Sequence, residues 1–132
     1  INLSKTLITS VPSSWLMEEF SGLLESLKGK LVIVEGKGDV AALEDLGILD
    51  VRELDRPIFE VVESVASVTD ECAILTDLDR AGKRLYGMLR KGLVAHGVKV
   101  DDSFRNFLFR ETKLRQIEGL TAYLRSRSPS LL

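Results

Sequence analysis

Two short apolar runs, each ending abruptly in carboxylates, constrain the fold of this chain more than any other feature. Residues 31–34 read LVIV and are followed by Glu35, and residues 73–76 read AILT and are followed by Asp77-Leu78-Asp79. Unbroken apolar runs of this kind are typical of strands buried on both faces of a sheet. Because Asp77 and Asp79 are two residues apart, their side chains leave an extended chain on the same side. We therefore expect the two strand ends to meet and form an acidic site.

Helical periodicity separates these runs from two further short strands. Apolar residues recur at helical spacing over about 13–29, 40–47, 57–68, 80–97 and 113–125, and short strands are expected at 51–54 and 98–100. Residues 101–112 fit either a helix or an extended segment. Strands that alternate with helices predict βαβ units, hence an α/β fold with a parallel sheet and helices on both faces. In such sheets, functional residues collect at the carboxyl ends of the strands, where Glu35, Asp77 and Asp79 fall.

The length and composition fit one cytoplasmic domain. A chain of 132 residues that is 45% hydrophobic can bury one core. It has no apolar run of the roughly 18 residues that a membrane helix needs, and its first residues do not resemble a signal peptide. The single cysteine, Cys72, cannot form an internal disulfide, which agrees with a reducing cytoplasm, and we expect it to pack in the core. Trp15, near the start of the first helix, is likewise expected in the core.

The charge is unevenly distributed along the chain. Residues 1–79 hold 6 Lys and Arg against 16 Asp and Glu, whereas residues 80–132 hold 12 against 4, so the two parts carry −10 and +8 and the whole chain −2. This asymmetry allows a basic surface beside an acidic pocket, which would suit phosphate groups held near a metal ion. It also fits solvated helix faces of opposite charge, and the sequence leaves both interpretations open.

The three carboxylates Glu35, Asp77 and Asp79 are the candidate metal ligands. Hard divalent cations such as Mg²⁺, and in its place Mn²⁺, prefer oxygen ligands, and a typical site has one to three carboxylates plus water and phosphate. Crowded carboxylates repel one another, so without a metal at least one should have a raised pKa. The alternative is that these residues cap helices or lie in solvated turns, which is common for Asp at the start of a helix.

Glycines and cations surround the same turns. Gly36-Lys37-Gly38-Asp39-Val40-Ala41 follows a strand and precedes a helix, so it matches a dinucleotide-binding pattern, with Asp55 nineteen residues beyond Gly36 as the acidic partner. Lys37 and Arg80 adjoin the acidic turns and could neutralise phosphate oxygens, as could Lys83 and Arg84. All four cations could equally be surface residues. A basic groove that ran from Arg80, Lys83 and Lys99 to the acidic cluster would favour binding of nucleic acid.

The two acidic motifs together resemble the Toprim domain of topoisomerases, bacterial-type primases, OLD-family nucleases, RecR proteins and the ribonuclease that matures 5S ribosomal RNA. The resemblance rests on VEGKGD at residues 34–39 and TDLDRAG at residues 76–82, and it covers roughly residues 30–125. With the segment IEGL at residues 117–120, the chain is most similar to small stand-alone Toprim proteins. The resemblance implies a compact Rossmann-like domain at 30–125 with about four parallel strands. The rest of the chain is then an N-terminal helical extension at 1–29 and a tail at 126–132.

The same resemblance implies functional roles. Glu35 would be a metal-linked general acid or base, and Asp77 and Asp79 would coordinate Mg²⁺. Gly82 would allow close backbone approach at the start of the helix, and Asp39 would support the site or cap a helix. Gly36, in the turn after Glu35, would be a cofactor-binding residue together with Asp39 and Gly82. We expect a Mg²⁺-dependent protein that acts on RNA or DNA by nuclease-like phosphodiester cleavage. The alternatives are a non-catalytic module that binds nucleic acid, a nucleotide or a partner protein, and a dinucleotide binder.

Overall fold

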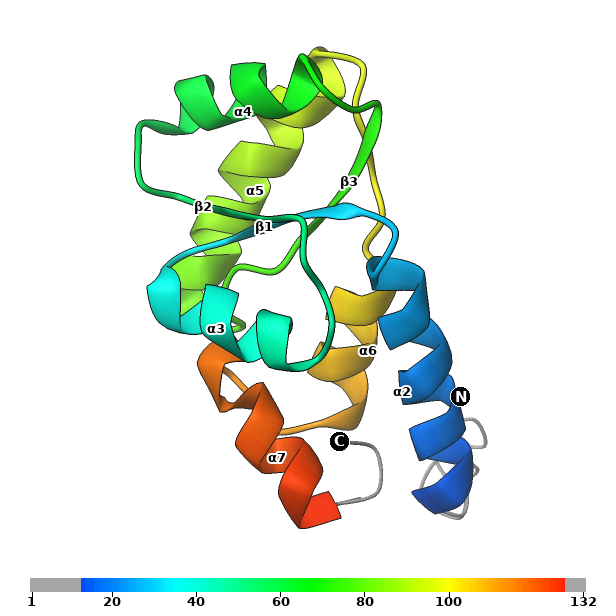
Figure 1. Cartoon of the computed structure of the whole chain (residues 1–132). Helices are drawn as coiled ribbons and strands as arrows, with labels where there is room; N and C mark the ends of the chain where they lie inside the picture. The colour runs from blue at the N-terminus through cyan, green and yellow to red at the C-terminus, as the bar shows by residue number, and fades with distance from the viewer. Residues whose placement is uncertain (1–12, 128–132) are drawn as a thin grey trace, which may run out of the picture.

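A four-stranded parallel sheet forms the centre of the computed structural model, which describes residues 13–127 (Figure 1). Its strands lie in the order β2-β1-β3-β4, with bounds β1 (Leu31–Val34), β2 (Val51–Glu53), β3 (Glu71–Ile74) and β4 (Lys99–Val100). The helices are α2 (Ser13–Leu27), α3 (Lys37–Asp45), α4 (Ile58–Ala66), α5 (Arg80–Ala95), α6 (Ser103–Glu111), the 3-10 helix η1 (Ile117–Gly119) and α7 (Leu120–Arg127). The predicted α/β fold, with four parallel strands, flanking helices and an N-terminal helix, is confirmed.

The strands β1 and β3 lie in the middle of the sheet, and both of their faces are buried. All four residues of β1 are buried, and Ile33 lies opposite Ile74 of β3 in the register. Alternate side chains enter two different cores: Val32 and Val34 pack on one face, and Leu31 and Ile33 on the other. The apolar runs without alternation are therefore the central strands, as expected from the sequence.

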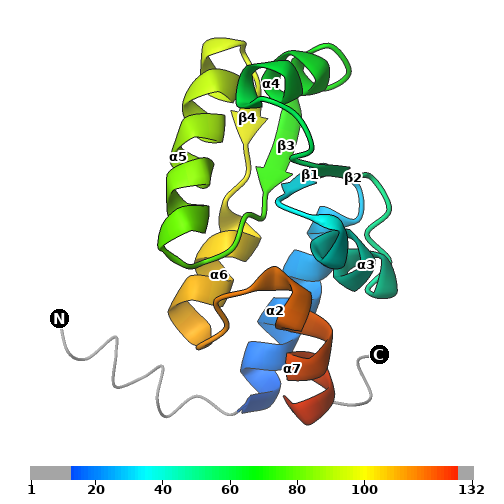
Figure 2. The same cartoon turned by 90° about the vertical axis from the view of Figure 1, so that its left-hand side faces the viewer.

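Helices cover both faces of the sheet (Figures 1 and 2). On one face, α4 and α5 bury an aliphatic cluster that includes Val62 and Leu93. On the other face, α2, α3, α6, η1 and α7 enclose the larger core. Cys72 of β3 is fully buried, and burial raises the pKa of its thiol to about 11, so its expected place in the core is confirmed.

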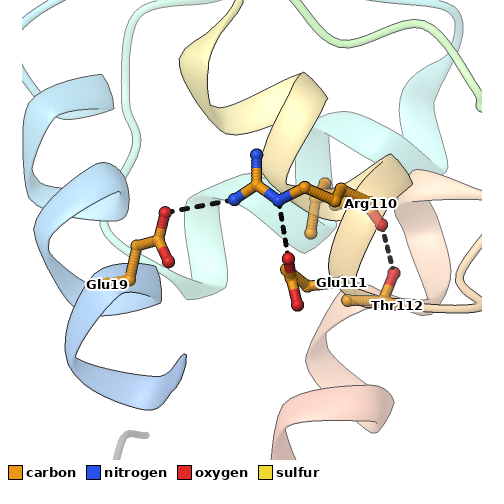
Figure 3. A network of polar contacts seen from close by, with 5 residues as sticks. Glu19, Arg110, Glu111 and Thr112 are labelled. Carbon is orange, nitrogen blue, oxygen red and sulfur yellow. Dashed lines mark hydrogen bonds and ion pairs between the residues drawn. The ribbon is translucent and has the colours of Figure 1, made fainter. Parts of the chain in front are cut away.

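The N-terminal helix α2 contributes directly to this larger core. Phe20 is 1% exposed, and its ring lies 5.3 Å from the ring of Phe104 and 5.8 Å from that of Phe107 in edge-to-face contacts. Figure 3 shows a polar tie at the surface, where Arg110 of α6 donates from Nη2 to Glu19 of α2 at 3.2 Å. The expected burial of Trp15 is wrong: its side chain is 60% exposed, because the helix directs Phe20 rather than Trp15 to α6.

Other boundaries differ from the sequence-based expectation. Residues 101–112, which the sequence left open, contain α6, whose apolar face buries Phe104, Phe107 and Leu108. The single helix expected at 113–125 is wrong, because residues 112–116 have no regular structure and a helical path begins only at Ile117. Residues 1–12 and 128–132 lie outside the described part, and so does most of the expected tail at 126–132.

Glycines end two of the predicted helices where expected. Gly47 follows α3 with φ of 85°, and Gly97 follows α5 with φ of 80°, a backbone region that other residues rarely adopt. Among residues 13–127, no helix is long and apolar enough to cross a membrane.

A matched pair of aromatic substitutions in α2 tests whether this helix is part of the core. Phe20→Ala should lower the free energy of unfolding by about 3–5 kcal/mol, because it leaves a cavity against Phe104 and Phe107. Trp15→Ala, on the same helix but exposed, should change it by no more than about 0.5 kcal/mol. Urea unfolding followed by circular dichroism measures both; equal effects of the two substitutions would contradict this packing.

Candidate functional site

Glu35 and the acidic turn, residues 77–79, meet at the carboxyl ends of β1 and β3. These strands are neighbours, and beyond their last paired residues the Leu75 N–H still donates to the Ile33 carbonyl at 2.7 Å. Because of this pairing, the loops that follow β1 and β3 begin side by side at the same edge of the sheet. The Asp77 N–H then donates to Glu35 Oε2 at 2.6 Å. The structure thus joins two motifs that lie 42 residues apart in the sequence.

Two further carboxylates of the site cap the helices that follow. Asp79 is the N-cap of α5, where its Oδ1 accepts from the Gly82 N–H at 2.8 Å. Asp39 is buried in the first turn of α3, where its Oδ2 accepts from the Gly36 N–H at 3.1 Å. Both contacts are helix-capping hydrogen bonds. The capping role considered for these residues is therefore present, and it holds both carboxylates at the sheet edge beside Glu35.

The segment 112–119 lies across the acidic turn. Asp77 Oδ1 accepts from the Ile117 N–H at 2.9 Å, and the Leu78 N–H donates to the Arg115 carbonyl at 2.7 Å. The same segment brings Glu118 against Gly38, where the Glu118 carboxyl carbon would lie 3.2 Å from a Cβ atom. Glu118 thereby becomes a fifth carboxylate of the site.

A buried arginine supports the turn from beneath. Arg105 of α6 is 7% exposed, and its guanidinium donates to the carbonyl of Thr76 and, at 3.1 Å, to that of Asp77. Its guanidinium also lies 4.6 Å from the centre of the Tyr86 ring. Burial lowers the pKa of Arg105, while the nearby negative charges of Asp102, Glu35 and Asp77 act in the opposite direction. The acidic turn is thus fixed through its backbone by a cation that leaves the carboxylates unpaired.

The electrostatics of the site match a crowded set of carboxylates. Burial raises the pKa of Glu35 above its ordinary value, against the hydrogen bond from the Asp77 N–H, and the charges of Asp77, Asp79 and Asp39 raise it further. Burial also raises the pKa of Asp39, with the hydrogen bond from Gly36 opposing and the charges of Asp77 and Glu118 adding. The pKa of Glu35 is therefore raised, as expected for a carboxylate of this site, but burial is the larger cause and crowding the smaller one.

The oxygen atoms of these side chains are the kind of ligand that a hard cation such as Mg²⁺ prefers. All the groups are carboxylates, and each would gain from a positive charge that relieved the repulsion. Within residues 13–127, however, no group of three such side chains already has metal-ligand spacing, and backbone N–H groups bind one oxygen each of Glu35, Asp77 and Asp79. Each carboxylate has a second oxygen, so Glu35, Asp77 and Asp79 remain the predicted ligands.

Only some of the basic side chains that the sequence suggested for the site lie near it. Lys37 is the first residue of α3 and Arg80 the first of α5; both are exposed, and neither forms an ion pair with a described residue. Lys99 lies at the other end of the sheet, since it pairs with Glu71 at the beginning of β3. Lys99 is therefore not part of a basic groove beside the acidic cluster.

Gly82 has no room for a side chain. A Cβ atom there would lie 2.5 Å from the carbonyl carbon and 2.8 Å from the Cα atom of Asp77. The Gly82 carbonyl also accepts from the buried Thr76 hydroxyl at 2.7 Å. The first turn of α5 thus packs directly on the backbone of the acidic turn, which is the close approach expected of this glycine.

Sequence reasoning missed Arg105 and Glu118 as residues of the site. Arg105 lies in the segment that fitted both helix and strand, so its buried direction could not be predicted. Glu118 belongs to the IEGL segment that carried part of the family resemblance, and the adjacent Gly38 is the signal that another group approaches closely.

These features define a class, the parallel α/β proteins whose acidic loops meet at the carboxyl ends of two neighbouring strands. No protein-family model matches the chain. A UPF0292 protein of Methanocaldococcus jannaschii is 32% identical over 117 residues, which cover 85% of this chain and 91% of that protein. One from Pyrococcus horikoshii is 37% identical over 114 residues, which cover 82% and 86%. The chain belongs to the UPF0292 family.

A solved structure shares the fold. It is a protein from Aquifex aeolicus that is 30% identical to this chain, with a TM-score of 0.69 over 77% of this chain and 94% of that one. The arrangement of strands and helices described above is therefore found in an experimental structure of a related sequence.

Two glycines of α5 form a matched test of the close approach at Gly82. Gly82→Ala should lower the free energy of unfolding by about 1–3 kcal/mol or more, because the methyl group must displace the backbone of Asp77. Gly87→Ala, where a Cβ atom meets nothing within 4 Å, should raise it by about 0.5–1 kcal/mol through helix propensity. Chemical denaturation of both variants measures the effect, and stabilisation by Gly82→Ala would contradict the contact.

The raised pKa of Glu35 predicts how stability depends on pH in EDTA. A carboxyl whose folded pKa exceeds its ordinary value of 4.5 favours the folded state below that value, and this contribution is lost as the pH rises through the folded pKa. Glu35→Gln keeps the acceptor for the Asp77 N–H and removes the titration. The melting temperature of Glu35→Gln should therefore exceed that of the wild type at pH 7 and approach it at pH 4; the opposite trend would refute the assignment.

Proposed function

We propose that this UPF0292 protein is a Mg²⁺-dependent enzyme of the Toprim class that cleaves phosphodiester bonds in nucleic acid. The observation that supports the proposal is the hydrogen bond from the Asp77 N–H to the Glu35 carboxylate, which unites the two motifs on which the resemblance rests. The raised pKa of Glu35, caused first by burial and then by the neighbouring carboxylates, supports it as well. We expect the protein to act in the cytoplasm, where its single cysteine stays reduced.

The residues of the site would have different roles in such a reaction. Glu35, Asp77 and Asp79 would hold Mg²⁺, or Mn²⁺ in its place, and the bound ion would supply charge neutralisation at the scissile phosphate and activation of water. Glu35, with its raised pKa, is the group that takes up or releases a proton. Lys37 and Arg80, at the exposed first positions of α3 and α5, would bind phosphate oxygens through their side chains.

A second candidate function is a non-catalytic module that binds nucleic acid, a nucleotide or a partner protein of nucleic-acid processing with the help of the same metal. One observation favours it: the segment 112–119 lies across the acidic turn, and Ile117 occupies an oxygen of Asp77. Such a module would bind in a metal-dependent way without turnover.

The dinucleotide interpretation gains less support. In that pattern the pyrophosphate lies at the glycine-rich turn before the helix. Here the carboxylate of Glu118 lies against Gly38 of that turn, and Asp39 is buried beside it, so a pyrophosphate would meet negative charge. Nicotinamide and flavin nucleotides should leave the melting temperature unchanged.

Amide substitutions of the three carboxylates test the enzyme. Glu35→Gln, Asp77→Asn and Asp79→Asn each keep the oxygen that accepts a backbone N–H, so the fold should persist, while the negative charge needed for the cation is lost. Each should lower the rate of cleavage of RNA or DNA substrates in Mg²⁺ by at least about 100-fold. The assay is gel electrophoresis of labelled strands, with melting temperatures of each variant recorded beside it.

Glu44→Gln is the matched control, because Glu44 is an exposed carboxylate on α3 outside the site. It should cleave at the wild-type rate. If wild-type protein cleaved neither RNA nor DNA with Mg²⁺ or Mn²⁺, yet either ion raised its melting temperature and Asp79→Asn abolished that rise, the binding module would replace the enzyme as the conclusion.

A further inference from the structure

An exposed aromatic ring that contacts two cations lies beside the acidic turn. Phe109 of α6 is 44% exposed, whereas Phe104 and Phe107 of the same helix are buried. The Lys83 ammonium lies 4.3 Å from the centre of the Phe109 ring, and the Arg115 guanidinium lies 5.1 Å from it. We call Lys83, Phe109 and Arg115 the basic–aromatic cluster.

The backbone fixes this cluster next to the acidic turn. The Arg115 carbonyl accepts from the Leu78 N–H at 2.7 Å, and the Lys83 N–H donates to the Asp79 carbonyl at 2.9 Å. Two of the three members are thus one hydrogen bond from the turn. In Figure 2, the beginning of α5 and the end of α6, which carry Lys83 and Phe109, lie at the same side of the molecule.

The charges of the cluster are not neutralised by the protein. Among the described residues, neither Lys83 nor Arg115 forms an ion pair with a carboxylate, and Arg115 donates only to the carbonyls of Thr112 and Leu114. Arg110, in contrast, pairs with Glu19 and Glu111. Cation–π contacts at exposed sites contribute little to folding, so stability alone gives little reason for two unpaired cations at one exposed ring.

We propose that the basic–aromatic cluster binds single-stranded nucleic acid: one base takes the place of a cation on the face of the Phe109 ring, and Lys83 and Arg115 bind the neighbouring phosphates. Aromatic rings bind bases through their faces, which are accessible in single strands and covered in duplexes, and cations bind the phosphates on either side. A strand bound in this way would place its next phosphate beside the acidic turn. This last step rests on the function proposed above, whereas the binding itself does not.

Binding to labelled oligonucleotides of about ten nucleotides tests the cluster, in EDTA and again in Mg²⁺ with uncleavable phosphorothioate strands. Fluorescence anisotropy at low salt gives the dissociation constants. Phe109→Leu keeps an apolar side chain without the ring and should weaken binding about tenfold, while Phe109→Trp should preserve it. Lys83→Ala should weaken binding several-fold and reduce its salt dependence. Lys91→Ala, the same charge change about 12 Å further along α5, should have a smaller effect.

Strand chemistry separates stacking from general attraction to phosphate. Single-stranded DNA and RNA of the same length should each bind more tightly than a blunt duplex or an abasic strand. Equal binding of the abasic strand, or an unchanged dissociation constant for Phe109→Leu, would overturn the proposal. Melting temperatures of the Phe109 variants show whether they remain folded. If Phe109→Leu does not fold, the dissociation constants of Lys83→Ala and Lys91→Ala are compared instead, and equal values for the two would overturn the proposal.

The two proposals fail in different ways. If Phe109→Leu weakens binding in EDTA but no substrate is cleaved with any metal, the cluster stands and the enzyme does not. If Glu35→Gln abolishes cleavage while Phe109→Leu binds and cleaves like the wild type, the enzyme stands and the cluster does not.

Discussion

The hydrogen bond from the Asp77 N–H to the Glu35 carboxylate is the contact on which the rest of the site depends. It exists because β1 and β3 are neighbours that are buried on both faces, so their ends cannot separate without opening the core. Gly82 and Arg105 then fix the same turn from two other sides, one by close backbone contact and one by binding its carbonyls. The carboxylates are held close together although their charges repel.

The fold was largely predictable because its signals are local. Apolar runs without alternation identified the buried strands, and Gly47 and Gly97 marked the ends of two helices. The errors came from tertiary contacts. Trp15 and Phe20 both suit a core, and only the position of α6 decides which of them is buried. Before the late start of the last helix, the Arg115 carbonyl accepts from the Leu78 N–H of the acidic turn, a contact that the sequence does not indicate.

The candidate site was predictable in its residue types but not in its supports. Carboxylates at the ends of two apolar runs are visible in the sequence, and the parallel fold places them at one edge. Glu118 and Arg105 belong to elements that follow β4. No periodicity indicates that Glu118 contacts the first βα unit or that Arg105 binds the turn after β3. The sequence did not show which basic residues lie near the site. Lys99, one of those considered, is far from the acidic turn both in sequence and in the sheet.

The contacts that assemble the acidic turn also set the order of folding. Asp77 is bonded to Glu35 across 42 residues and to Ile117 across 40, so both contacts close long loops. Long loops cost chain entropy before their contacts form, and this delays such contacts relative to helix formation. The contact of Glu35 with Asp77 needs the pairing of β1 with β3, and the contact of Ile117 with Asp77 needs the docking of a segment that follows β4. The site should therefore be among the last parts of the chain to gain protection from hydrogen exchange during refolding.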